Sequence, residues 1–169
     1  MEGTRTTLVQ MRTCDVIWHK ENMINLGISM LPWDWKYCAW IDADVQFNNP
    51  RVVEDTIHQL RMHAIVQMFE TAVNLGPRGE TIDMYKSFCY QYLAGGCNPP
   101  PKPAQMSAYA FWHPGFAWAC TREAFEAMGG LIDFAILGAG DHHMAYAFIG
   151  LVDHSYPGNV SESYQRKLR

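Results

Sequence analysis

Residues 37–47 read YCAWIDADVQF, an apolar run that ends in two aspartates separated by one alanine. A short and nearly continuous apolar run, here residues 36–41, is typical of a strand that is buried on both faces. Asp42 and Asp44 lie two positions apart, so at the end of that strand their side chains point to the same side. Because ionised carboxylates in an apolar setting are costly without a positive partner, the stretch predicts a cation beside these two aspartates.

Helices and strands alternate on either side of this run. Apolar spacing and capping residues predict helices over residues 18–30, 49–60, 121–130 and 141–150, with Asn49, Thr121 and Asp141 as caps. Further predicted elements are a strand over residues 64–71, a turn over 75–81 into a return strand, and a stiff proline-rich loop over 94–103. This alternation predicts one α/β domain over residues 1–169, with a mostly parallel sheet and flanking helices.

The composition is that of an ordinary folded domain. Of the 169 residues, 49% are hydrophobic and 18% are charged, which argues against disorder. The net charge is −4 and the basic residues are scattered, so no nucleic acid partner is expected. The five cysteines form no C-x-x-C pair, which favours a reducing, cytoplasmic setting over a disulfide framework or a structural zinc site. We expect neither a signal peptide nor a membrane span, because no apolar stretch is long enough.

Two interpretations of Asp42 and Asp44 are open from the residues alone. Mn²⁺ and Mg²⁺ take carboxylate oxygens and commonly share their coordination with substrate phosphates. Ligands of open α/β sheets bind at the carboxyl ends of strands, so a divalent ion with a diphosphate behind it could be the positive partner. In the other interpretation the two aspartates cap a turn and the helix that follows.

A second candidate site lies in GAGDHHMA, residues 138–145. Asp141 follows a glycine-flanked turn and precedes a helical pattern, so its carboxylate can serve as a general base toward a hydroxyl or orient one. It can equally be a plain helix cap. His142 and His143 are neutral ligands or proton carriers near neutral pH, and we expect at most one of them to face the same site as Asp141.

Two further stretches contain candidate binding residues. In WHPGFAW, residues 112–118, Trp112 offers a stacking surface and His113 begins a His-Pro-Gly interruption, which is typical of a loop lining a site; an aromatic run is also common in a core. In the first predicted helix, Lys20 or His19 could reach a phosphate and Asn25 offers an amide contact. A solvated face is the alternative for Lys20.

In this order, the motifs resemble the GT-A glycosyltransferases, closest to family 2. The resemblance rests on N-x-G at Asn25 and Gly27, the strand ending in D-A-D, the stretch REAFEAMGGLID and the glycine-flanked Asp141. It covers residues 18–150. It implies a Rossmann-like GT-A domain that transfers a sugar, typically a hexose, from a nucleotide-diphosphate sugar to the hydroxyl of a glycan or other acceptor.

The resemblance also implies roles for particular residues. Asp42 and Asp44 match the D-x-D motif, which holds Mn²⁺ or Mg²⁺ and the donor diphosphate. Asp141 matches the acidic motif that acts as base or binds the acceptor, and His143 is a candidate for a further metal ligand. Together with the two aspartates, the expected donor-binding residues are Lys20, Asn25, Trp112 and His113.

The chain departs from the GT-A pattern at its N-terminal end. Few residues precede the first predicted helix, whereas GT-A domains begin with a strand–helix–strand unit that binds the nucleotide base. We therefore expect a truncated domain, or one that a homo-oligomer or another subunit completes. Two other functions stay open: a non-catalytic GT-A-like assembly module, and a metal-dependent phosphoesterase of the DHH type, which the triplet Asp141-His142-His143 resembles.

Overall fold

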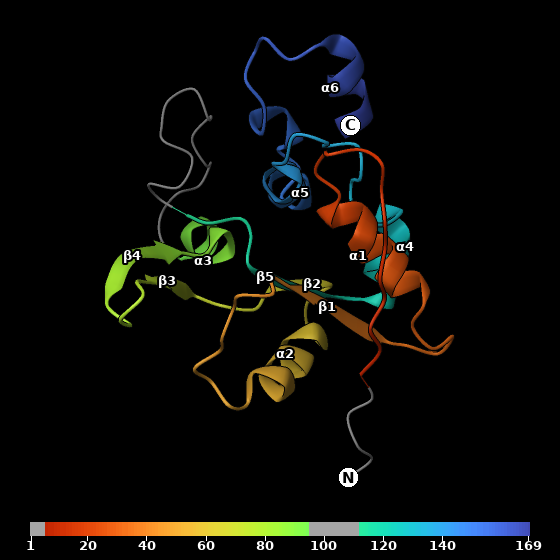
Figure 1. Cartoon of the computed structure of the whole chain (residues 1–169). Helices are drawn as coiled ribbons and strands as arrows, with labels where there is room; N and C mark the ends of the chain where they lie inside the picture. Colours follow the sequence, from red (N-terminus) through yellow and green to blue (C-terminus); the bar gives the residue numbers. More distant parts are fainter. Residues whose placement is uncertain (1–5, 95–111) are drawn as a thin grey trace.

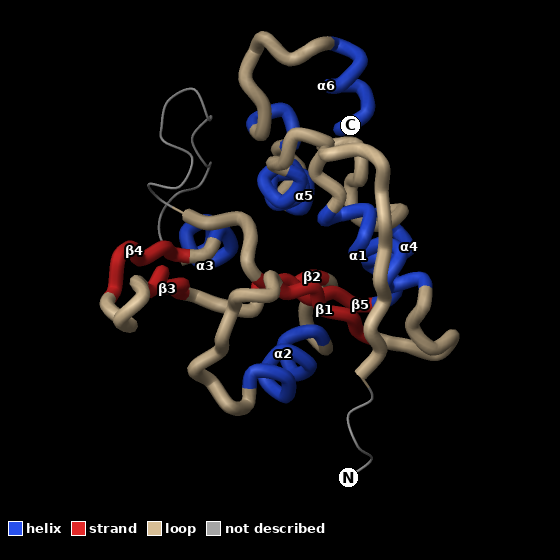
Figure 2. Tube along the Cα trace, in the orientation of Figure 1, coloured by secondary structure: helices blue, strands red, loops and turns tan. Residues whose placement is uncertain are grey.

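Two small sheets and six α-helices make up residues 6–94 and 112–169, the part of the chain that the computed structural model describes (Figure 1). The helices are α1 (Lys20–Ser29), α2 (Val52–Leu60), α3 (Phe88–Leu93), α4 (Arg122–Met128), α5 (Gly140–Phe148) and α6 (Glu162–Leu168), with a short 3-10 helix, η2 (Val152–His154), after α5. The strands are β1 (Tyr37–Ile41), β2 (Ile65–Gln67), β3 (Thr71–Leu75), β4 (Thr81–Lys86) and β5 (Ala117–Thr121). The fold is thus mixed α/β, as the sequence predicts (Figure 2).

The main sheet has the strand order β1-β5-β2, and β5 runs antiparallel to both of its neighbours. The expected mostly parallel sheet is therefore not what the described strands form, since each of their ladders is antiparallel. The physical reason is the position of β5. It lies between β1 and β2, which run in the same direction, and so separates the two strands that could have paired in parallel.

Burial identifies β5, and not β1, as the strand enclosed on both faces. Ala117, Trp118, Ala119 and Cys120 of β5 are at most 4% exposed. In β1, Cys38 is buried while Tyr37 and the other alternate residues are exposed. The prediction that residues 36–41 are buried on both faces is therefore wrong, because only one face of β1 lies against the core.

Helices cover the two faces of the main sheet unequally. Figure 1 shows α2 on one side of the sheet and α1, α4 and α5 on the other. Two apolar clusters fill the second side: Phe88, Trp112, Trp118, Ala145 and Tyr146 form one, and Ile28, Cys38 and Cys120 form the other. Among the described helices, none is long and apolar enough to cross a membrane.

Local signals in the sequence predict some element ends better than others. Thr121 caps α4 by accepting a hydrogen bond from Ala124 N, and Gly129 ends that helix in a left-handed conformation, as predicted. The expected cap Asn49 instead accepts from Arg51 N in the turn before α2, which begins at Val52. The predicted strand 64–71 divides into β2 and the start of β3. Of the predicted loop 94–103, residues 95–103 lie outside the described part.

The second sheet is a hairpin of β3 and β4. Its turn lies within residues 75–81, where the sequence predicts it, and Gly79 adopts a φ of 79° that suits glycine. Lys86 at the end of β4 pairs with Glu70, which precedes β3. This ion pair therefore holds the end of β4 against the segment between β2 and β3, which links the hairpin to the main sheet.

Candidate functional site

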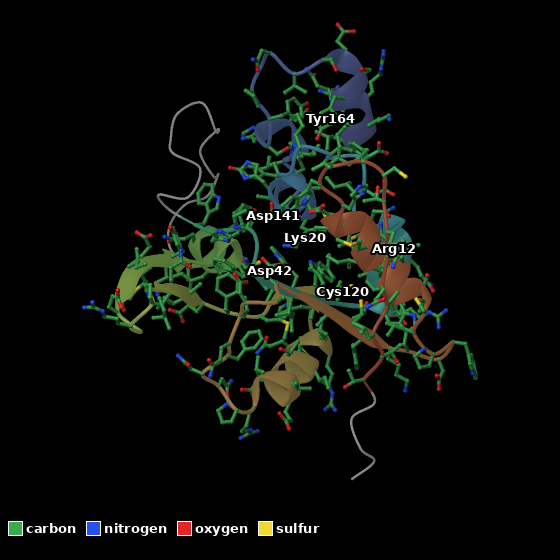
Figure 3. The ribbon with its side chains drawn as sticks, in the orientation of Figure 1. Arg12, Lys20, Asp42, Cys120, Asp141 and Tyr164 are labelled. Carbon is green, nitrogen blue, oxygen red and sulfur yellow. The ribbon has the colours of Figure 1, made fainter. Side chains whose placement is uncertain are left out.

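A small pocket lies where α1, the end of β1, the segment before β5 and the start of α5 meet. Figure 3 shows Lys20, Asp42 and Asp141 close together although they come from three different elements. The free volume is about 20 Å³, enough for roughly one water molecule. The residues that line it are Lys20, Glu21, Ile24, Trp40, Asp42, Gly115, Phe116, Trp118, Leu131, Asp141, Met144 and Phe148.

Lys20 is the positive partner that Asp42 has in this structure. Its Nζ forms an ion pair with Asp42 Oδ1, and the two side chains are 28% and 27% exposed. The backbone N–H of Asp42 donates to the carbonyl of Phe116 at 2.8 Å, which extends the β1–β5 pairing by one residue and holds the aspartate in place. In this structure the positive partner of Asp42 is thus an ammonium group on α1, and the divalent ion expected from the sequence stays a prediction.

The His-Pro-Gly segment lies beside this ion pair. The ring of Phe116 stacks on the ring of His113 with centroids 3.8 Å apart, and Phe116 adopts a φ of 70°, rare for a residue with a side chain. His113 Nδ1 accepts a hydrogen bond from Gly115 N. Burial lowers the pKa of His113, against the opposing charges of Asp141 and Asp42, so the imidazole is mostly neutral near pH 7.

Asp141 enters the pocket from the first turn of α5. Its Oδ1 accepts from the N–H of His142 at 2.8 Å, and the helix is capped by Ala139 in a left-handed conformation, not by Asp141 as predicted. A Cβ on Gly115 would lie 2.6 Å from Asp141 Oδ2. Glycine at position 115 therefore leaves the space that the Asp141 carboxylate occupies.

The structure adds a third pocket carboxylate, Glu21, that sequence reasoning missed. Glu21 is only 6% exposed, and its carboxylate lies so close to Gly140 that a Cβ there would be 2.6 Å from Oε1. Burial raises the pKa of Glu21, and the nearby charge of Asp141 raises it further. The available signal is weak, because a Lys-Glu pair at the start of a helix usually lies on its solvated face.

Gln67 is a second residue near the pocket that was not predicted from the sequence. Its side-chain amide donates to the carbonyl of His113 at 2.9 Å, and its Oε1 accepts from Cys89 N. Gln67 is buried, and its hydrogen bond to the carbonyl of His113 holds the loop that contains His113 and Gly115. A polar residue inside the apolar strand IVQ is the signal that could have singled it out.

Asp44 faces a different cavity. It is exposed and its carboxylate has no partner in the described part of the chain. It lines an open cleft of about 690 Å³, together with Val45, Gln46, Phe47, Asn48, Asn49, Val52, Met68, Phe69, Glu70, Thr71, Ala72, Val73, Asn74, Leu75 and Phe116. Phe116 lines both cavities, so the cleft and the pocket meet at this residue.

The proposed third metal ligand, His143, lies elsewhere. Its Nδ1 bonds to Ser155 Oγ at 2.8 Å, its ring contacts Tyr164, and burial lowers its pKa to about 4. Within residues 6–94 and 112–169, no three His, Cys, Asp or Glu side chains gather closely enough to hold a metal ion. The structure therefore does not bring His143 to Asp42 and Asp44.

Two other predicted binding residues have structural contacts. Asn25 uses both ends of its amide on the backbone of Leu131, at 2.8 Å each, and so ties α1 to the turn after α4. Trp112 is buried in the core against Phe88 and Tyr146. Of the predicted residues, Lys20, Asp42 and Asp141 line one pocket, and His113 lies next to it.

His142, the second residue of the Asp-His-His triplet, is also part of the core. Its ring lies 4.9 Å from that of Tyr146, and burial lowers its pKa to about 4. It is 9% exposed. A phosphoesterase would need this imidazole at a metal centre open to substrate, so its burial gives that alternative no support.

Comparison with known proteins gives no relative from which a function could be carried over. No protein-family model matches the chain, and no curated protein or solved structure matches it either.

Proposed function

We propose that this protein is a glycosyltransferase of the GT-A type, which transfers a hexosyl group from a nucleotide-diphosphate sugar to an acceptor hydroxyl. The observation that carries the proposal is the convergence of Lys20, Asp42 and Asp141 on one pocket at the end of β1. These residues are far apart in sequence and belong to three elements. A cation next to two carboxylates suits a reaction in which a diphosphate leaves and a hydroxyl loses its proton.

In this reaction Lys20 would stabilise the negative charge of the leaving group. Cleavage of the bond between the anomeric carbon and the phosphate leaves the electron pair on the nucleoside diphosphate. The Lys20 ammonium can stabilise that negative charge by moving from Asp42 toward the phosphate. The free volume of about 20 Å³ requires such a movement before a ligand can enter.

Asp141 is the group that would handle the acceptor. In an inverting reaction the acceptor oxygen bonds to the anomeric carbon and its proton goes to the Asp141 carboxylate. In a retaining reaction Asp141 would instead orient the acceptor. Gly115 lets backbone and ligand approach this carboxylate closely.

A divalent ion fits part of the site. Asp42 and Asp44 are carboxylates of the kind that Mn²⁺ and Mg²⁺ take, and Asp44 is exposed without a partner in the described chain, while His143 is engaged with Ser155. Asp42 faces the pocket and Asp44 the cleft, so the two aspartates could hold one ion only if Asp42 left Lys20 and the two carboxylates turned toward each other. Other positions would be left to water and diphosphate. When bound, the ion supplies Lewis-acid stabilisation of the leaving diphosphate.

The direction of the strands leaves room for the mostly parallel sheet of a GT-A domain. β1 and β2 run in the same direction, and the free edge of β1 is open within the described residues. Parallel strands added at that edge, from a completing subunit or a second copy, would make the sheet mostly parallel as in a GT-A domain. The exposed side chains of Tyr37 and Ile41 on β1 are consistent with a surface that is covered in such an assembly.

Calorimetry with nucleotide sugars tests the function. The wild type, titrated with uridine and guanosine diphosphate sugars in the presence of Mn²⁺, should bind at least one donor. Asp44→Ala and Lys20→Met should each weaken that binding at least roughly tenfold, because each removes a charge-assisted contact. The matched control is Asp34→Ala, an exposed aspartate before β1 with no partner in the described chain. Absence of binding by the wild type, or equal binding by all variants, would contradict the proposal.

One observation favours a non-catalytic assembly module as the second candidate. The pocket is nearly filled, and Lys20 already satisfies Asp42, as in a site that no longer binds a ligand. This function predicts no donor binding, and a stable oligomer in light scattering.

A further inference from the structure

The open cleft next to Asp44 has the size of a binding site for a small molecule. Its volume of about 690 Å³ falls within the range of roughly 300–1,000 Å³ that such sites have. One wall is the loop of residues 44–49, and the other is β3 with the segment before it.

The side chains along the cleft are aliphatic, aromatic and polar in mixture, and none of the lining residues is a lysine or an arginine. Rings come from Phe47, Phe69 and Phe116, and amides from Gln46, Asn48 and Asn74. The amide of Asn49, which also lines the cleft, is already bonded to Asp55 and to the backbone of Arg51. Asp44 and Glu70 add two carboxylates. The nearest cation on the hairpin, Lys86, is already paired with Glu70 at 2.7 Å.

This lining selects by charge and by hydrogen bonding. An anionic ligand would meet the unpaired carboxylate of Asp44, a Glu70 that Lys86 already neutralises, and no unpaired cation among the lining side chains. A ligand rich in hydroxyl groups would find amides that both donate and accept, and carboxylates that accept. The apolar faces of its rings could pack on phenylalanine.

We propose that this cleft binds an uncharged oligosaccharide, as the acceptor of the transfer reaction. The assignment as acceptor rests on the proposed function. Phe116 lines both the cleft and the pocket, so a sugar held against Phe47 and Phe69 can present a hydroxyl toward Asp141. Phe69 and Phe116 contact each other edge-on at 5.6 Å and form a continuous apolar floor between the two cavities.

The free edge of β3 offers a competing occupant, an extended peptide. β3 pairs only with β4 in the described chain, so its other edge has unpaired backbone groups. The sugar is favoured because rings and side-chain amides come from the opposite wall as well, which strand pairing does not need. If no neutral trisaccharide binds, the sugar proposal is overturned and the peptide on β3 is the occupant that remains.

The test uses neutral and acidic trisaccharides as probes. Maltotriose, cellotriose, triacetylchitotriose and trigalacturonate are titrated into the full chain and followed by calorimetry and by NMR of backbone amides. At least one neutral probe should bind with shifts in residues 44–49 and 69–75, and trigalacturonate should not. Phe47→Ala should weaken binding roughly fivefold or more, because the sugar loses a stacking surface.

Controls keep the result interpretable. Phe47 makes no ring contact in the described part of the chain, so its removal should leave the core intact, and Asn74→Ala provides a second variant on the other wall. Trp33→Ala removes an aromatic ring that is 86% exposed at the opposite end of β1, and it should bind as the wild type does. Asp44→Asn combined with Glu70→Gln should improve the binding of trigalacturonate.

The outcomes separate the two proposals. No binding of any neutral probe, equal binding of trigalacturonate, or unchanged binding by both Phe47→Ala and Asn74→Ala would overturn the glycan cleft. If a nucleotide sugar binds while no glycan does, only the cleft proposal fails. If a glycan binds in the cleft and no nucleotide sugar binds to the pocket, the glycan site stands and the transferase function fails.

Discussion

Asp42 and Lys20 show, at the scale of single residues, how the electrostatic problem of the D-A-D stretch is solved. The carboxylate ends a strand and the ammonium comes from a helix 22 positions earlier in the chain, so the pair exists only once α1 packs over β1. When an ion pair is mostly shielded from water, removing one partner leaves the other charge unpaired and poorly solvated, and this lowers the stability of the fold. Its loss should therefore be measurable.

Removal of the ammonium is the first prediction. Lys20→Met keeps the aliphatic length of the side chain but leaves Asp42 without its partner, and we expect the free energy of unfolding to fall by about 1–3 kcal/mol. Urea denaturation at pH 7 measures it. Lys36→Met is the matched control, since Lys36 is exposed and its side chain has no partner in the described chain. Equal stability of the two variants would contradict the structural role of the pair.

Glu21 gives the second prediction, which depends on pH. Because burial raises its pKa in the folded state, the folded protein favours the neutral acid, and stability is lost as the pH rises from the unfolded value of 4.5 through the folded value. Glu21→Gln removes this loss. The variant should be more stable than the wild type at pH 7, and the difference should vanish below about pH 4. Urea denaturation across this pH range checks it, and a constant difference at all pH values would argue against the buried carboxyl.

At the scale of elements, glycines decide how closely α5 and the segment before β5 approach their neighbours. A Cβ at Gly115 would meet the Asp141 carboxylate, and one at Gly140 would meet that of Glu21. The nearest atom in each case is the end of a carboxylate side chain, which can move, and at Gly115 the ring of His113 also lies 3.0 Å away. These positions should therefore control the arrangement of the pocket more than the stability of the fold.

A pair of alanine substitutions tests this distinction. Gly27→Ala in α1 meets nothing within 4 Å and should stabilise the protein by about 0.5–1 kcal/mol, because alanine favours the helix. Gly115→Ala should change stability little, yet displace Asp141 and lower transferase activity by roughly a hundredfold. Thermal unfolding and a donor-turnover assay measure the two effects. Full activity of Gly115→Ala would show that the position of Asp141 is not critical.

At the scale of the whole molecule, the outer edge of β1 pairs with no other strand of the described chain. A flat strand edge next to exposed apolar side chains favours pairing with another strand. We expect association that increases with protein concentration, and Ala39→Lys in the middle of β1 should reduce it. Multi-angle light scattering measures it, with Met62→Lys at the exposed end of α2 as the control. A monomer at all concentrations would argue against a completing partner at this edge.

Local sequence patterns predicted those helices, strands and element ends that depend on residues only a few positions apart. α1, β1 and α4 follow from apolar spacing, and Thr121 and Gly129 mark the ends of α4 as expected. The end of β1 at Asp42 follows as well, because a charged residue stops an apolar strand. The predicted helix caps Asn49 and Asp141 each lie two residues from the observed caps, Arg51 and Ala139, since a polar side chain near a helix start can bond to either the turn or the helix.

The sequence by itself determined that an apolar strand delivers Asp42 to its end, that a helix with Lys20 precedes it, and that Asp141 starts a later helix. Only the tertiary structure decided that β5 lies between β1 and β2, that Lys20 is the cation beside Asp42, and that Glu21 is buried over Gly140. It also decided that Asp44 faces a separate cleft and that His143 bonds to Ser155. The reason is physical. Caps and periodicity depend on residues within a few positions, whereas strand order and the partner of a charge depend on which distant surfaces pack together, and this information is not in any local pattern.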